Sequence, residues 1–447
     1  MTLQELKNAL VKAAEKAGVA TYEIYFQKSE ELSAGALKDE INSFSSGVSG
    51  GLCFRCIVDG KMGYASGELL TEDAMEDLVK RAIANAKCID SEDEAIIFAG
   101  SPSYLTTTAP VPQLADPSTI RELALALQKD LYAACDKVGD GTRSQAVSVV
   151  SEVYLYNSYG LELSNRGGAT GATVSPVLRQ DGEAQSGFEF GLGSTYEDVK
   201  DLPQKALAKA LDKFGAALVP TGRYDVVIDG KQFYTILSAF TSVFSAKNAQ
   251  LGLSLLAGKE GEVIASPCVS IYDDPMRPES PMQTAFDGEG VATYRKAVVE
   301  DGVLKTLLYD LTTAKKAGKS STGNGQKAGY SSPVAISPYN FGICAGTDTE
   351  EQLFAKVGEG IYITEVKGLH AGTNAVTGDF SIESAGFMIR GGKRAEPVKS
   401  FTMAGNFFEL LKSIECLGDT VKWGVPFGLT VFGSPNVLVR DMSIAGK

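Results

Sequence analysis

The stretch from Tyr362 to Gly418 has the sequence YITEVKGLHAGTNAVTGDFSIESAGFMIRGGKRAEPVKSFTMAGNFFELLKSIECLG. Its pattern predicts a strand, a polar glycine-rich turn, a strand, a Gly-Gly hairpin, a third strand and a helix. Asn406 is expected to cap that helix and Gly418 to end it. The stretch also holds His370, the only histidine of the chain. We therefore expect it to form the floor of a groove, with the rest of the chain placed around it.

The composition of the whole chain is typical of a globular protein with a sizeable core. The chain has 447 residues, of which 44% are hydrophobic and 22% are charged, and this length suits two or three domains. The net charge of −13 argues against nucleic acid as a partner, because binding to a phosphate backbone needs clustered Lys and Arg. No apolar run approaches the roughly 18 residues that cross a bilayer, so no membrane partner is expected.

Cysteine usage indicates a reducing compartment. Seven cysteines are scattered along the chain, and the N-terminal residues resemble an amphipathic helix start rather than a signal peptide. An odd number of scattered cysteines without an export signal is typical of free thiols, which predicts a cytoplasmic protein.

The first half of the chain predicts an α/β domain with antiparallel hairpins. Apolar residues at helical spacing follow the capping box of Thr2 and Glu5. Short strands are expected at Tyr22–Phe26, Ile41–Phe44 and Gly51–Val58. Further helices and glycine-punctuated strands continue to a break at residues 215–223, which contains Pro220 and Gly222. This break predicts an N-terminal domain of residues 1–215.

The second half, residues 223–447, predicts a mostly antiparallel β domain. A strand at Tyr224–Ile228 precedes Asp229, which can cap a helix with one apolar face from Phe233 to Phe244. Strands dominate after that helix, and the polar glycine-rich segment from Lys315 to Ser332 is expected to be a solvated loop. The predicted fold class is therefore α+β rather than a parallel α/β fold.

Two short motifs raise catalytic hypotheses that their context does not favour. Gly47-Val-Ser49-Gly-Gly51 matches the elbow of serine hydrolases, but an elbow needs a helix after the serine and a strand is expected here. Glycines in the approach to a hairpin explain the pattern better. An independent hydrolase that uses Ser49 or His370, with Asp379 as a candidate partner of His370, stays open as an alternative. A turn histidine bonded to the backbone is the simpler interpretation of His370.

The sequence supports metal, redox and nucleotide sites even less than it supports the two hydrolase hypotheses. Cys53 and Cys56 form a CxxC pair, but residues i and i+3 of a strand face opposite sides, so packing is favoured over metal or redox chemistry. The segment Gly318-Lys-Ser320 ends like a phosphate-binding loop, yet Thr313 stands where its first glycine belongs. Nucleotide binding is therefore rejected, and no cofactor is expected.

Several motifs in order resemble one known family. They are the segments from His370 to Ser381, from Ala385 to Phe387 and from Phe401 to Asn406, the loop ending Ser321-Thr-Gly-Asn324, and the N-terminal pattern around Gly51, Arg55 and Gly63. Together these segments resemble the TldD/PmbA (TldE) family, also called modulator of DNA gyrase, and the resemblance covers nearly the whole chain.

The resemblance implies a choice between two kinds of subunit. One kind carries an HExxxH helix and a C-terminal cysteine that bind a metal, and the other lacks them and pairs with the first. The matching positions here are approximately Ser238, Ala239 and Val243, and the region of the third ligand, around Leu417–Gly424, shows no ligand motif. None of these side chains can replace an imidazole ligand or a general-base carboxylate. The chain thus resembles the PmbA/TldE type, with no catalytic residue and no metal of its own.

From the resemblance we expect a partner subunit of a cytoplasmic metalloprotease that acts on unfolded peptides. Its partner would be a TldD-type catalytic subunit, and the chain alone would form a homodimer. The strands of residues 362–406 and the loop of residues 318–329 are expected to line a shared chamber and bind peptide by strand addition. Another alternative is a regulatory protein-binding scaffold. The candidate substrate contacts, which could equally hold the loops in shape, are Asn324, His370, Asn374, Asp379 and Asn406.

Overall fold

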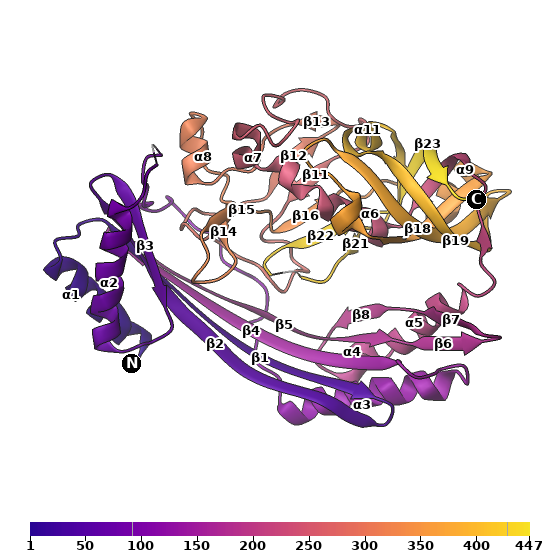
Figure 1. The fold of residues 1–447 in the computed structure, drawn as a ribbon, viewed down its shortest axis with the longest axis horizontal. Helices are drawn as coiled ribbons and strands as arrows, with labels where there is room; N and C mark the ends of the chain where they lie inside the picture. The colour runs from indigo at the N-terminus through magenta and orange to yellow at the C-terminus, as the bar shows by residue number, and fades with distance from the viewer. Residues whose placement is uncertain (92, 427) are drawn as a thin grey trace.

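The computed structural model describes residues 1–91, 93–426 and 428–447. Figure 1 shows a long curved sheet of the N-terminal half below a β-rich C-terminal half. The sheet is antiparallel throughout, with strand order β3-β2-β1-β4-β5-β8. The elements of this half are α1 (Leu3–Lys16), β1 (Tyr22–Leu37), β2 (Glu40–Val58), β3 (Lys61–Gly67), α2 (Glu72–Lys87), α3 (Pro117–Ala134), β4 (Arg143–Asn157), β5 (Glu162–Ser175), β6 (Val177–Gln180), β7 (Glu183–Ser186), β8 (Glu189–Leu192), α4 (Tyr196–Val199) and α5 (Leu202–Leu211).

The central hairpin β1–β2 is much longer than the sequence predicts. The pieces expected at Ile41–Phe44 and Gly51–Val58 are one strand of 19 residues, paired along its length with β1. Gly51 lies inside that strand and not in a hairpin approach. A Cβ there would come within 2.6 Å of the Tyr330 ring and 2.7 Å of the Gly67 carbonyl oxygen. Close approach of a segment distant in sequence therefore requires this glycine.

Alternation along β1 and β2 divides the sheet into two faces. Ile24 and Phe54 pack under α1 and α2, whereas Leu32, farther along the same face, packs under α3 and α5. The opposite face carries Tyr25 and Cys53, which pack against Phe286 of the second half. One continuous sheet thus supports two helical cores and also carries the contact between the halves.

The C-terminal half is mostly antiparallel, as predicted. Strands β10, β17, β18, β19 and β23 pair in a closed ring, to which β9 and β20 attach, and a second sheet has the order β13-β12-β11-β16-β22-β21. The elements are β9 (Ala217–Leu218), β10 (Gly222–Ile228), α6 (Gly230–Ala239), η1 (Thr241–Phe244), α7 (Ala246–Gln250), β11 (Ile271–Asp273), β12 (Lys296–Glu300), β13 (Val303–Leu304), α8 (Leu311–Lys316), β14 (Gly325–Lys327), β15 (Val334–Ile336), β16 (Asn340–Ile343), α9 (Glu350–Val357), β17 (Gly360–Lys367), α10 (Leu369–Gly372), β18 (Asp379–Arg390), β19 (Lys393–Asn406), α11 (Phe407–Lys412), β20 (Ile414–Leu417), β21 (Lys422–Trp423), β22 (Val431–Ser434) and β23 (Val437–Ala445).

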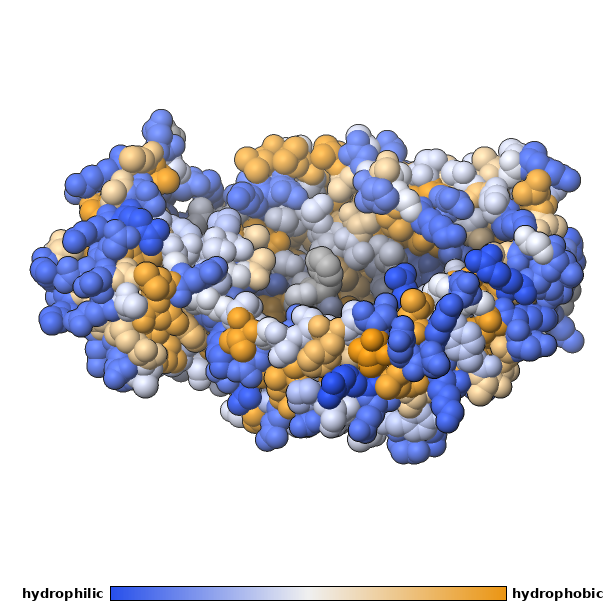
Figure 2. Space-filling model, turned by 60° about the horizontal axis from the view of Figure 1, so that its bottom comes forward, coloured by the Kyte–Doolittle hydropathy of each residue, from blue (hydrophilic) through white to orange (hydrophobic). Residues whose placement is uncertain are grey.

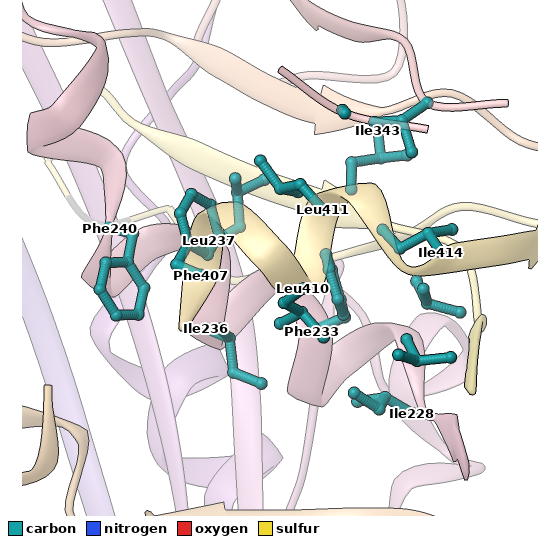
Figure 3. Packing of buried hydrophobic residues seen from close by; sticks show 14 of the residues in the cluster. Ile228, Phe233, Ile236, Leu237, Phe240, Ile343, Phe407, Leu410, Leu411 and Ile414 are labelled. Atoms are coloured by element: carbon teal, nitrogen blue, oxygen red, sulfur yellow. The ribbon is translucent and has the colours of Figure 1, made fainter. Parts of the chain in front are cut away.

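Helices α6 and α11 fill the core of this half, and both are shorter than predicted. Figure 3 shows the apolar side chains of the two helices packed together, and the rings of Phe240 and Phe407 stack at 4.5 Å between centroids. Helix α6 ends at Ala239 and a 3₁₀ turn follows. The helix expected to reach Gly418 ends at Lys412, because the next residues pair with β23 as strand β20. Sheet pairing here overrides an apolar pattern that suits a helix.

The segment between the predicted domains is itself part of the second half. Strand β9 pairs in parallel with β19, so residues 215–223 are not a free linker. The division into residues 1–215 and 223–447 stays a prediction. No helix among the described residues is long and apolar enough to cross a membrane.

Candidate functional site

The loop between β17 and β18 is held by its own polar side chains. Gly368 adopts φ +75° and opens the short helix α10. Asn374 Oδ1 accepts the backbone N–H groups of Val376 and Thr377, at 3.0 and 3.3 Å, which is an Asx turn. His370 is exposed on α10 and makes no hydrogen bond within the described residues. The predicted backbone-bonded turn histidine is therefore wrong.

Asp379 and Asn406 close the same loop. Asn406 Nδ2 donates to the Thr377 carbonyl oxygen and to Asp379 Oδ1, both at 2.9 Å. Asn406 Oδ1 accepts the Phe408 N–H at 3.1 Å, which caps α11. The hydrogen bond from Asn406 lowers the pKa of Asp379. These contacts hold the loop in shape and leave His370 and Asn374 at the surface.

Asn324 lies in a different place and is fully buried. Its Nδ2 donates to Asp273 Oδ2 at 2.8 Å and to the Ser337 carbonyl oxygen at 3.0 Å, while its Oδ1 accepts from Thr322. For residues 322–327, which are buried, the predicted solvated loop is therefore wrong, whereas residues 328–332 are exposed or half-buried. The structure does not bring the five candidates into one site, and it gives Asn324 a structural role.

Among the described residues, the sheet of residues 362–406 leaves little free edge for strand addition. Strand β18 lies between β17 and β19, and β19 pairs with β9 and β23 on its other side. Most hydrogen-bonding groups in the middle of these strands are thus already used, while Glu365–Lys367 of β17 pair only with β18. Peptide binding by strand addition stays a prediction.

The structure shows a cavity at the start of α6 that sequence reasoning missed. This α6 cavity has a volume of about 490 Å³ and lies between the two halves, with β8 and α5 on one side and α6, β17 and β21 on the other. Figure 2 shows a hollow between the halves, with hydrophilic residues over much of the rim. The side chains that line it include Phe188, Glu189, Phe190, Lys209, Lys231, Tyr234, Thr235, Tyr362 and Lys422.

Asp229 joins three of the elements around this cavity. Its Oδ1 accepts the Lys231 N–H at 2.8 Å and so caps α6. Its Oδ2 accepts from Lys422 Nζ of β21 at 2.6 Å and from the Tyr362 hydroxyl of β17 at 2.9 Å. One carboxylate thereby fixes the helix start and both strands, and its cap is the feature that the sequence did predict.

A second ion pair crosses from the N-terminal half. Lys231 Nζ lies 2.9 Å from Glu189 Oε2, and Lys209 of α5 contacts the same carboxylate. Burial alone would raise the pKa of Glu189, but the two lysines outweigh it and lower this pKa. Burial raises the pKa of Tyr234 to about 12. The cavity thus offers charges of both signs, hydroxyl groups and aromatic rings, which suit binding of polar and apolar side chains.

Catalysis by a serine, a cysteine or a histidine does not fit this cavity within the described residues. The described residues that line it include no histidine, cysteine or serine. The alternative based on Ser49 also lacks an elbow, because Ser49 lies exposed inside β2, opposite Ser29. Within the described residues, no hydrogen bond links His370 to a serine or a carboxylate.

Comparison with known protein families covers most of the chain. The model of the PmbA/TldA metallopeptidase C-terminal domain matches residues 221–446, that of domain 1 matches residues 22–86, and that of the central domain matches residues 111–214. The chain belongs to the PmbA/TldD family. The family models thus place two domains within residues 1–215.

Relatives and solved structures agree with this family. A Methanocaldococcus jannaschii protein without an assigned function is 31% identical, over 93% of this chain and 95% of its own. A Haemophilus influenzae homologue of the metalloprotease PmbA is 25% identical, over 94% and 92%. A suggested modulator of a DNA gyrase from Thermotoga maritima is 28% identical, with TM-score 0.89 over 99% and 100% of the two chains. TldE from Thermococcus kodakarensis, 23% identical, has the same fold, with TM-score 0.89 over 99% and 100%.

The family name implies a metal, and the matching positions of this chain do not fit one. Ser238 Oγ donates to the Thr235 carbonyl oxygen at 2.7 Å, and Ala239 carries no donor atom. Val243 is 0% exposed within the main apolar core, on the 3₁₀ turn after α6. A ligand needs a donor atom aimed at a shared point, and these three side chains offer only one hydroxyl group, already used.

The region that the resemblance matches to a third metal ligand, around Leu417–Gly424, does not fit a metal either. Cys416 Sγ accepts from Lys356 Nζ at 3.3 Å, and it packs with a cluster separate from that of its neighbour Leu417. Burial raises the pKa of the Cys416 thiol, while the hydrogen bond from Lys356 acts against this rise. Within the described residues no group of three or more His, Cys, Asp or Glu side chains is arranged to hold a metal.

Proposed function

We propose that this chain is the metal-free partner subunit of a TldD/TldE-type metalloprotease that acts on unfolded peptides. The observation that carries the proposal is the α6–η1 segment. In place of the metal-binding helix implied by the family resemblance, this segment presents Ser238 and Ala239 and buries Val243 in an apolar core. Such a chain can contribute binding surface, while the partner contributes the metal.

The α6 cavity is the peptide-facing surface in this proposal. Its lysines and carboxylates can bind polar side chains and chain ends, and Phe188, 54% exposed, can bind apolar ones. A disordered peptide that binds in such a place loses conformational entropy, so several weak contacts are needed together. His370, Asn374, Asp379 and Asn406 remain candidates for surface contacts outside this cavity.

Assembly and location belong to the same proposal. The catalytic partner carries HExxxH. Without this partner the chain forms a homodimer, through the surface that otherwise contacts the partner. All seven cysteines are free thiols, which supports a reducing cytoplasm. Size-exclusion chromatography with light scattering should show a dimer of this chain alone and a heteromer after addition of the partner, whereas monomers in both samples would contradict this.

The decisive experiment is reconstitution with a histidine-bearing TldD-type subunit from the same genome. Neither chain alone should cleave an unfolded peptide at the rate of the mixture, and zinc should be found at one ion per catalytic subunit. One tight zinc ion on this chain, with peptide cleavage by the purified chain alone, would overturn the proposal.

A matched pair of variants tests the α6 cavity in the reconstituted enzyme. Lys231→Ala with Lys422→Ala removes two of its cations, and KM for an acidic peptide should rise about tenfold, since hydrogen bonds to charged groups carry that much affinity. Lys80→Ala, on the exposed face of α2, serves as the control and should leave KM unchanged. An equal effect of both changes would show that the cavity does not bind peptide.

A further inference from the structure

A second cavity, beside α8, has no role in the proposed function. It has a volume of about 990 Å³, which lies at the upper end of the range for small-molecule sites. Strands β2 and β3 and the segment after α2 line it on one side, and α7, α8, β14 and β15 line it on the other. Figure 1 shows these elements facing each other across the upper left of the molecule. We call it the α8 cavity.

Lys327 lies at the floor of this cavity and is only 4% exposed. Its Nζ donates to Cys53 Sγ at 3.1 Å and lies over the rings of Tyr25 and Tyr64, at 4.5 and 5.3 Å from their centroids. Within the described residues no carboxylate lies within 4 Å of this nitrogen. A lysine has three N–H donors and a buried one needs partners, so Lys327 has hydrogen-bonding capacity left for a ligand.

Glu289 is the second polar group of the floor, and it is 4% exposed. Its Oε2 accepts the Leu311 N–H at 2.9 Å. Burial, with a smaller contribution from the neighbouring Asp287, raises the pKa of Glu289 to about 8, while Arg55 acts against this rise. The raised pKa favours the protonated carboxyl group, which can donate a hydrogen bond.

The other charged groups near the floor already have partners. Arg55 is held by Glu23 through two hydrogen bonds of 2.9 Å. Asp310 caps α8 by accepting the Thr313 N–H at 2.8 Å. Lys327 and Glu289 are therefore the two floor groups available as donors.

The walls above this polar floor are largely apolar. They include Met62, Ile89, Ile96, Leu251, Leu307 and Val334. At the rim, charges of both signs pair with each other, as Lys316 does with Asp93 at 2.6 Å. A ligand that fits has one polar end and an apolar body.

We propose that the α8 cavity binds a small amphipathic carboxylate, with its head group on Lys327 and Glu289 and its apolar body against these walls. The unused N–H donors of Lys327, on a floor that it shares with Glu289, favour an anion, and a cationic head group would meet Lys327. The carboxylate belongs either to a free acid or to the C-terminus of a short apolar peptide. This inference is independent of the proposed protease role, because it needs neither the partner subunit nor the α6 cavity.

Titration calorimetry on the full chain tests the proposal with defined probes. Octanoate represents a free acid, Gly-Gly-Leu with a free C-terminus represents a peptide end, and octanamide, amidated Gly-Gly-Leu and octylamine are the controls. At least one carboxylate should bind one to one at pH 7 and exceed its own amide about tenfold in affinity, since it gains charge-assisted hydrogen bonds. Whichever carboxylate binds identifies the source.

Three variants locate the binding. Lys327→Met should weaken the carboxylate about tenfold, and Val334→Trp should weaken it by filling the cavity, even if the first variant does not fold. Lys80→Met, on the exposed face of α2 and outside the cavity lining, is the matched control and should bind like the original chain. Binding that survives both cavity changes, tighter binding of octylamine, or no binding of either carboxylate overturns the proposal.

Discussion

At the scale of single residues, the ion pair of Glu23 and Arg55 shows how one contact fixes the central hairpin. The two residues lie directly opposite each other on β1 and β2, on the face toward the second half, and are 0% and 6% exposed. Burial alone would lower the pKa of Arg55, but the Glu23 carboxylate outweighs it and raises this pKa. The two parallel hydrogen bonds satisfy the Arg55 guanidinium and the Glu23 carboxylate, which are both buried away from water.

We predict that Arg55→Met lowers the free energy of unfolding by about 3–5 kcal/mol, because it leaves the Glu23 carboxylate buried without a partner. Adding Glu23→Gln should recover most of this loss. Arg81→Met, which breaks an exposed ion pair with Asp77, should change the free energy of unfolding by less than about 1 kcal/mol. Denaturant titration measures all three, and an Arg55→Met effect as small as that of the control would contradict the prediction.

At the scale of elements, the end of α6 decides what the chain can bind. Asp229 caps the helix as the sequence predicts, but the helix stops at Ala239, and the next apolar residues form a 3₁₀ turn in the core. Val243 therefore points into the cluster around Phe240 and Phe407 rather than toward a cavity. The absence of ligands here is thus a matter of backbone shape as well as of residue type.

Restoring the motif should not restore a metal site. The triple change Ser238→His, Ala239→Glu and Val243→His places an imidazole where an apolar core is packed, and burying this polar group costs about 1–3 kcal/mol. We expect a lower melting temperature than that of the Ser238→His, Ala239→Glu double variant. Metal analysis after dialysis against zinc should find no stoichiometric ion, and one tight zinc ion per chain would show that the segment can still form the site.

At the scale of the whole molecule, the two halves share buried contacts. Tyr25, Cys53 and Leu155 of the long sheet pack with Phe286, and ion pairs such as Lys213 with Glu365, at 2.9 Å, cross between the halves. Surface pairs add little, so the apolar cluster is the main connection. The halves should therefore unfold together.

Removing this connection should separate them. Phe286→Ala, at a residue 6% exposed, should lower stability by about 3–5 kcal/mol and split one calorimetric transition into two. Phe354→Ala is the matched control, because Phe354 packs only with residues of the C-terminal half. It should lower the melting temperature without splitting the transition. A single transition in both variants would mean that other contacts couple the halves.

The sequence by itself determined the local features and the family. The capping box of Thr2 and Glu5, the cap by Asp229 and the mostly antiparallel second half all follow from neighbouring residues, whose signals are complete within a few positions. The motifs around His370 and Asn406 identified the family, while a role for these residues in substrate binding stays a prediction.

Only the tertiary structure decided where those residues lie and what they face. Residues 414–417 form a strand because β23 lies beside them. Asn324 can be buried because its side-chain amide donates a hydrogen bond to Asp273. The two cavities form between segments more than a hundred residues apart in the sequence. Burial and pairing of this kind depend on contacts distant in sequence, which no local pattern encodes. For the same reason the stretch from Tyr362 to Gly418, expected as the floor of a groove, forms three strands of the closed ring and gives only some of its side chains, Tyr362 among them, to the α6 cavity.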